Sequence, residues 1–168
     1  MEPTSDKNAV ARLFLRLLFC YLLTLPLSLF CGASLPVTLT VAGEAQGAFV
    51  LLALLAGFST LTKPALILFT AIKAFLDLAL LRAVLREATS GFLSILPFNA
   101  CLLFLFASLI FYLAAAARAE YFTFRTPARD GKLLREPAFW RYLLSALAFF
   151  AAATVLALLW RWLYSLLF

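Results

Sequence analysis

Lys73 and Asp77 are the residues whose types and spacing could do chemistry in this sequence. Both lie inside an apolar segment, and their spacing places them on one face of a helix, together with Thr70. Isolated charges inside a membrane cost several kcal/mol, so we expect the pair to face protein and not lipid. Lysine before aspartate is the less favourable order on a helix, which predicts further partners from other helices.

Two interpretations of this intramembrane polar pair are open. Lys73 and Asp77 could relay a proton or an ion. They could instead form an ion pair that fixes how the helices pack, as buried polar groups do in some proteins. We favour the packing role, because a transporter usually carries more ionisable groups inside the membrane than this.

Four further residues carry signals for helix packing. Ala53 and Gly57 stand four residues apart, a pair of small residues that lets another helix approach closely. Pro97 and Asn99 open a later apolar segment. The amide of Asn99 could donate a hydrogen bond across helices, or it could cap a helix end.

A basic stretch separates the last two apolar segments. It carries Arg118, Arg125, Arg129, Lys132 and Arg135. In membrane proteins such residues chiefly signal orientation, but they could also bind anionic lipid or a cytoplasmic partner. The net charge of +6 arises from basic residues beside apolar segments, so we expect no nucleic-acid partner.

No nucleophile–base arrangement can be built from this sequence. There is no histidine, and Cys20, Cys31 and Cys101 form no CxxC motif, so zinc, haem and iron–sulfur clusters lack their usual ligands. No Gly-rich phosphate loop or Walker pattern occurs either. We therefore expect no catalytic residues, no metal and no cofactor.

The composition predicts an all-α fold, a polytopic transmembrane helical bundle of about five helices in one domain. Hydrophobic residues make up 65% of the chain, well above the share in soluble domains. The expected helices span residues 9–35, 47–62, 64–85, 92–117 and 138–166. The segment 47–62 is barely long enough to cross, so a re-entrant hairpin of 47–62 and 64–85 is the alternative. Trp140 and Trp160 lie about 30 Å apart along the last helix, which predicts an aromatic belt at each end.

The distribution of basic residues predicts an orientation. With five crossings, ten Lys and Arg residues fall on the side of the N-terminus and three on the other side. Such an excess marks the cytoplasmic side. We expect a multi-pass protein of the bacterial cytoplasmic membrane, with its N-terminus in the cytoplasm and its C-terminus outside.

The runs GFSTLTKPALILFTAIKAFLDLALL and TSGFLSILPFNACLLFLFASLIFYLAAA resemble the stage II sporulation protein M family of Firmicutes. The resemblance covers residues 47–117 and rests on Gly57, Ser59, Lys73, Gly91, Leu96, Pro97 and Asn99. The sequence departs from the family pattern after Lys73. The family often has a glycine there, whereas this chain has Ala74 and Phe75, and Asp77 stands where another glycine would be expected. The resemblance implies an integral membrane scaffold that holds peptidoglycan-degrading partners in an engulfment complex.

Three functions follow as hypotheses. The first is a non-enzymatic scaffold that assembles other membrane proteins, such as peptidoglycan hydrolases or their anchors. The second is an accessory membrane subunit of an ABC-type transporter, whose ATPase would dock on the basic stretch 118–135. The third is a small proton-coupled carrier that uses Lys73 and Asp77.

Overall fold

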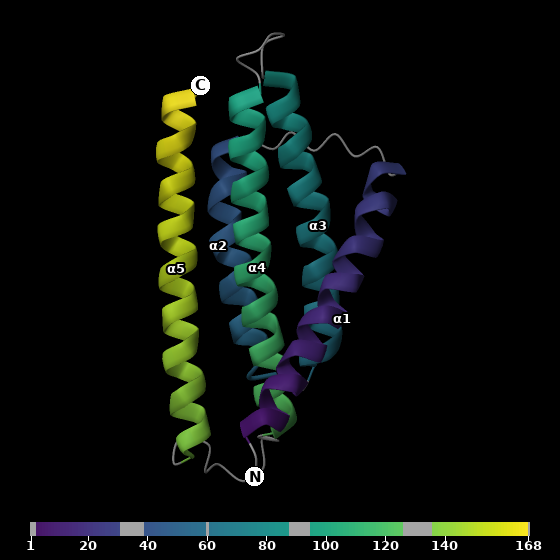
Figure 1. Cartoon of the computed structure of the whole chain (residues 1–168), viewed down its shortest axis with the longest axis vertical. Helices are drawn as coiled ribbons and strands as arrows, with labels where there is room; N and C mark the ends of the chain where they lie inside the picture. Colours follow the sequence, from purple (N-terminus) through teal and green to yellow (C-terminus); the bar gives the residue numbers. More distant parts are fainter. Residues whose placement is uncertain (1–2, 31–38, 60, 88–94, 126–135, 168) are drawn as a thin grey trace.

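The computed structural model describes residues 3–30, 39–59, 61–87, 95–125 and 136–167. This described part of the chain forms five helices: α1 (Pro3–Phe30), α2 (Leu39–Ala56), α3 (Thr62–Glu87), α4 (Ile95–Arg125) and α5 (Pro137–Leu167). Successive helices run in opposite directions, so the two termini lie at opposite ends of the bundle (Figure 1). The structure confirms the predicted all-α helical bundle.

Helix α4 is the centre of the bundle and contacts all four other helices. Helix α1 crosses α3 and α4 obliquely, and α5 stands along the opposite flank, against α2 and α4 (Figure 1). Helix α3 packs on α1, α2 and α4. Helices α2, α3 and α4 therefore pack against one another in the interior of the bundle. Helix α1 covers α3 and α4 on one side, and α5 covers α2 and α4 on the other.

Within the described part of the chain, four helices are long and apolar enough to cross a membrane, over Asn8–Leu27, Thr62–Leu85, Ile95–Thr123 and Pro137–Leu163. This is the pattern of a multi-pass membrane protein. Helix α2 has a shorter apolar part, Ala45–Ala56. Its full 18 residues rise about 27 Å, close to the hydrocarbon thickness of about 30 Å. It lies beside α4 over much of the length of α4 in Figure 1.

Helix α2 lies earlier in the chain than the sequence predicts. The expected helix is 47–62, which leaves 36–46 outside any expected helix, but the structure has α2 at Leu39–Ala56. The break falls at Gly57 because the turn after α2 is held by Thr62, whose hydroxyl donates to the carbonyl of Ala56 (2.7 Å). Pro64 then lies in the first turn of α3, where its missing N–H costs no hydrogen bond.

Helix α4 extends eight residues beyond its predicted end at 117, so Arg118 and Arg125 lie on a helix and not in a loop. The reason is that polar side chains in this last part pack inside the bundle. Glu120 is buried against Arg16 of α1. The hydroxyl of Thr123 donates to the carbonyl of Gly57 (2.8 Å). Helix α1 runs from Pro3 to Phe30, whereas 9–35 was expected; residues 31–35 lie outside the described part of the chain.

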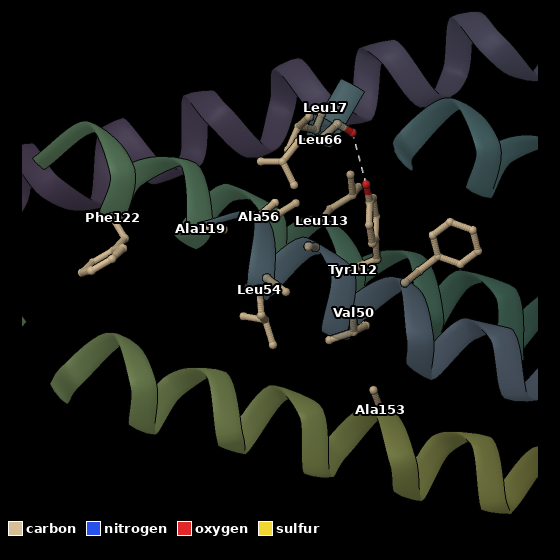
Figure 2. Close-up of a cluster of buried hydrophobic side chains, with 14 of the residues drawn as sticks. Leu17, Val50, Leu54, Ala56, Leu66, Tyr112, Leu113, Ala119, Phe122 and Ala153 are labelled. Carbon is tan, nitrogen blue, oxygen red and sulfur yellow. Dashed lines mark hydrogen bonds between the residues drawn. The ribbon is translucent and has the colours of Figure 1, made fainter. Parts of the chain in front are cut away.

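The main apolar core lies between the helices and draws side chains from all five. In Figure 2, Leu54 of α2 and Phe122 of α4 point toward α5, and Ala153 of α5 points back toward α2. The ring of Phe122 stacks on Tyr142 of α5 at a centroid distance of 4.3 Å. These contacts fix α5 against the α2–α4 pair.

A second apolar cluster, containing Leu80, Val84, Cys101, Phe104, Leu105 and Trp160, lies toward the end that carries the C-terminus. Trp160 is 2% exposed and stacks on Phe104 with ring centroids 4.5 Å apart. The sequence prediction that Trp160 belongs to an aromatic belt is therefore wrong, because its ring fills the space between α4 and α5. Trp140 and Trp162, at 52% and 60% exposed, lie on the outer surface.

Candidate functional site

Five buried polar side chains meet inside the bundle, and we call them the polar cluster: Tyr21 of α1, Gln46 of α2, Lys73 and Asp77 of α3, and Ser108 of α4. Lys73 lies halfway along the apolar span Thr62–Leu85 of α3. Four helices therefore contribute to one polar site near the middle of the bundle.

Asp77 makes four hydrogen bonds in the polar cluster, as many as Lys73. Its Oδ1 accepts from Gln46 Nε2 (2.8 Å) and from Lys73 Nζ (3.1 Å). Its Oδ2 accepts from the Tyr21 hydroxyl (2.7 Å) and from Lys73 Nζ (3.0 Å). A carboxylate offers about four lone-pair positions, so the carboxylate of Asp77 is saturated by its neighbours.

Lys73 is saturated in the same way. Besides Asp77, its ammonium donates to the Gln46 Oε1 oxygen and to Ser108 Oγ (3.1 Å). The hydroxyl of Ser108 donates in turn to Gln46 Oε1 (2.7 Å). An ammonium carries three N–H donors, and all can be used within the polar cluster. The cluster contains one cation and one anion and is formally neutral, which limits the cost of burying it.

The polar cluster continues toward the start of α3 through Thr70, one helical turn before Lys73. Its hydroxyl lies 2.9 Å from the Tyr112 hydroxyl of α4 and donates to the Leu66 carbonyl (2.6 Å). The Tyr112 hydroxyl also bonds the Leu66 carbonyl (3.3 Å, dashed in Figure 2). Thr70, Lys73 and Asp77 thus form one polar stripe along α3. Thr70 and Lys73 bond α4, and Asp77 bonds α1 and α2.

Three members of the polar cluster were missed by sequence reasoning. Gln46 is the sole glutamine of the chain, but it fell in the segment read as a loop. Tyr21 and Ser108 stand in the middle of apolar runs, where hydroxyl side chains are common. The order of Lys73 and Asp77 did predict partners from other helices, and the structure supplies them from α1, α2 and α4.

A crevice of about 220 Å³ reaches the polar cluster from the side of the bundle. Tyr21 and Asp77 line it, together with apolar residues of α1, α3 and α4 such as Leu81 and Phe106. The exposed lining is almost entirely apolar, because the polar atoms of Asp77 are turned to its partners. The crevice would hold hydrocarbon in a membrane.

A second ion pair joins α1 to α4 nearer the N-terminal end of the bundle. Arg16 donates to Glu120 Oε2 at 2.5 Å. The Arg16 side chain is 42% exposed, whereas Glu120 is 2% exposed. The other carboxylate oxygen, Oε1, is buried without a hydrogen-bond partner among the described residues. Glu120 lies beyond the expected helix end at residue 117 and beside basic residues, so the local sequence does not indicate its burial.

The predicted small pair lies at the corner where α2, α4 and α5 meet. Ala53 is fully buried. A Cβ at Gly57 would lie 3.0 Å from Tyr142 Cζ and 3.2 Å from Ala119 Cβ, and closer still to the Tyr142 hydroxyl. The same hydroxyl donates to the Leu54 carbonyl (2.6 Å). The small residues here serve contacts within the chain.

The remaining predicted residues are not brought into the polar cluster. Pro97 is buried in the first turn of α4, and Asn99 is exposed two residues later, on the outside of the bundle. Arg118 is exposed on α4, with its guanidinium 4.7 Å from the ring centroid of Phe149. Arg125 is the last residue of α4; Arg129, Lys132 and Arg135 lie outside the described residues.

Among the described residues, no group of three or more His, Cys, Asp or Glu side chains is placed to hold a metal ion. Comparisons with known protein families, with curated proteins and with solved structures find no match for this chain. The resemblance to the stage II sporulation protein M family therefore stays a prediction. Of the residues that carry it, Lys73 is in the polar cluster, Gly57 is at the packed corner, and Gly91 is outside the described part.

Proposed function

We propose that this protein is a non-enzymatic membrane scaffold that assembles other membrane proteins. The observation that carries the proposal is the closed polar cluster. Lys73 and Asp77, the pair that could have done chemistry, are fully hydrogen-bonded to each other and to Tyr21, Gln46 and Ser108. A saturated neutral network ties four helices into one arrangement, which is what a rigid platform requires.

The outer face of α5 is the surface that we propose for partner helices. Ala148 and Ala151 are exposed on it, and Ser145 and Ala152 are partly exposed. Small side chains let backbones approach closely, and they are enriched where membrane helices meet. The other pair of small residues, Ala53 and Gly57, is occupied by contacts within the chain and supports no partner.

The described basic residues support the proposed orientation. Arg12, Arg16, Lys63, Arg118 and Arg141 lie at the end of the bundle where the chain starts, and Arg82 and Arg161 lie toward the other end. By the positive-inside rule, the first end is cytoplasmic. We propose the bacterial cytoplasmic membrane, with peptidoglycan-remodelling proteins as the partners that the family resemblance implies.

Purification from the native membrane in mild detergent tests the scaffold function. We expect other membrane proteins to be recovered with the tagged chain. Ala148→Phe should reduce their recovery, because a bulky ring on the outer face of α5 blocks close helix approach. Leu103→Phe is the matched control, since Leu103 is 71% exposed on α4. A chain that is recovered alone, and is stable alone, would refute the proposal.

A proton-coupled carrier is the second candidate, because Asp77 lines a crevice that opens to the side of the bundle. In vesicles with a pH-sensitive dye, a carrier would lose proton flux on Asp77→Asn while it keeps its fold. Loss of stability without any flux in the unaltered protein would remove this candidate. An accessory transporter subunit would instead be recovered with an ATPase.

A further inference from the structure

A groove of about 640 Å³ runs between α1 and α4 at the end of the bundle where the chain starts. Its walls are apolar and include Val10, Phe14 and Leu15 of α1 and Ala114 of α4. Arg118 and Tyr121 of α4 also line it. It is larger than the crevice beside Asp77, and it combines apolar walls with a cationic side chain.

The depth of Arg118 can be estimated from the polar cluster. Ser108 contacts Lys73, which lies halfway along the apolar span of α3. Ten residues separate Ser108 from Arg118, a rise of about 15 Å along α4. Half the hydrocarbon thickness is also about 15 Å, so Arg118 lies where lipid phosphate groups begin. Ala114, one turn closer to Ser108, lies within the hydrocarbon.

The guanidinium of Arg118 is held in place and has no carboxylate partner among the described residues. It lies over the Phe149 ring of α5 at 4.7 Å, a cation–π contact that positions the charge and leaves its N–H donors available. The nearby carboxylate, Glu120, is paired with Arg16. Arg12, one residue after the groove residue Ala11, is exposed and adds a second positive charge at this end. Arg118 and Arg12 are thus two exposed cationic side chains at this end of the groove.

We propose that the α1/α4 groove binds a phospholipid with an anionic headgroup. One acyl chain would lie along Phe14, Leu15 and Ala114, and the phosphate would accept hydrogen bonds from Arg118. This site is separate from the partner face on α5 and from the polar cluster. Its binding would fix α1 to α4 from outside, in addition to the Arg16–Glu120 pair.

Native mass spectrometry of the delipidated full chain tests the site, with palmitoyl-oleoyl phosphatidylglycerol and palmitoyl-oleoyl phosphatidylcholine as probes. The two lipids share their acyl chains and differ in headgroup charge. We expect the chain to retain phosphatidylglycerol preferentially, and Arg118→Gln to weaken that retention about fivefold, the effect of one basic residue near anionic lipid. Arg141→Gln is the matched control, because Arg141 is exposed at the same end but does not line the groove.

Two further measurements separate the groove from unspecific charge attraction. Ala114→Phe should fill the apolar part and lower the retention of both lipids, with helicity by circular dichroism unchanged. A photo-crosslinking residue at Ala11 should form lipid adducts in native membranes. Equal retention of the two lipids, retention unaffected by Arg118→Gln, or a protein adduct at Ala11 would overturn the proposal; the last would assign the groove to a partner helix.

Discussion

Removing both members of the Lys73–Asp77 pair should cost much less stability than the two single removals added together. Asp77→Asn leaves the Lys73 ammonium buried with neutral partners, and Lys73→Met leaves the Asp77 carboxylate without its cation. Breaking a buried ion pair from one side costs about 3–5 kcal/mol, because the remaining charge is uncompensated. The two single changes would therefore sum to about 6–10 kcal/mol if they were independent.

The double variant Lys73→Met with Asp77→Leu should cost much less than this sum. It removes both charges and leaves Gln46 bonded to Ser108. The principal remaining losses are the Tyr21 hydroxyl and the Gln46 amide N–H, which would both lack an acceptor in the place of Asp77, at about 1–3 kcal/mol each. The coupling energy between Lys73 and Asp77 should then be about 4 kcal/mol, the gap between the middle of the summed costs and the middle of the combined costs.

Unfolding in mixed micelles, followed by circular dichroism as sodium dodecyl sulfate is titrated in, measures these free energies. Lys63→Met is the control, because Lys63 is exposed at the start of α3 and should change stability by less than about 0.5 kcal/mol. If the single variants do not fold while the double variant does, the conclusion is the same. Additive costs, with a coupling energy within about 0.5 kcal/mol of zero, would refute the structural role of the pair.

Two other predictions concern the attachment of α5. Gly57→Ala should destabilise the protein by about 1–3 kcal/mol, because the added methyl group displaces the Tyr142 hydroxyl from the Leu54 carbonyl. The same change should cost less stability in a Tyr142→Phe background. Equal costs in both backgrounds would exclude this cause. Trp160→Ala should cost about 3–5 kcal/mol of stability in the same titration, because the Trp160 ring is buried. Trp162→Ala should cost about 0.5 kcal/mol or less, because the Trp162 ring is exposed. Similar losses for the two variants would contradict the packing of Trp160 on Phe104.

The fold class and the pair Lys73–Asp77 could be predicted because each depends on local pattern. Long apolar segments demand helices, and a spacing of four residues fixes one helical face. The rest of the polar cluster could not be predicted, because Tyr21, Gln46 and Ser108 acquire their roles only when three other helices place them against α3. A hydroxyl or amide in an apolar run looks the same whether it faces a partner or caps its own backbone.

The predicted helix boundaries are wrong where the local residue types favour a loop but packing in the bundle favours a helix. Residues 39–46 contain glycine and glutamate and resemble a loop, yet they begin α2. Arg118, Glu120 and Arg125 resemble a polar connection, yet they continue α4. In the second case the burial of Glu120 against Arg16 of α1 explains the difference, because a contact across more than one hundred residues leaves no trace in the local sequence.

The placement of the polar contacts explains how the helices can hold together inside a membrane. Lipid tails are as apolar as leucine, so apolar burial alone does not drive helices together there; hydrogen bonds and close packing must. The polar cluster supplies these bonds to α1, α2, α3 and α4. Helix α5 contributes no residue to it, and the described contacts that hold α5 include the Tyr142–Leu54 hydrogen bond and the rings of Phe122 and Phe104.

Helix α5 is thus attached by a different set of interactions from the other four helices, and it is the helix that presents the proposed partner face. Changes at Gly57 or Tyr142 should loosen α5 and weaken partner recovery, while the hydrogen bonds among Lys73, Asp77 and Gln46 persist. Changes at Lys73 or Asp77 should instead loosen the contacts among all four helices α1, α2, α3 and α4. If both kinds of change lowered partner recovery only in proportion to global stability, α5 would have no separate role in assembly.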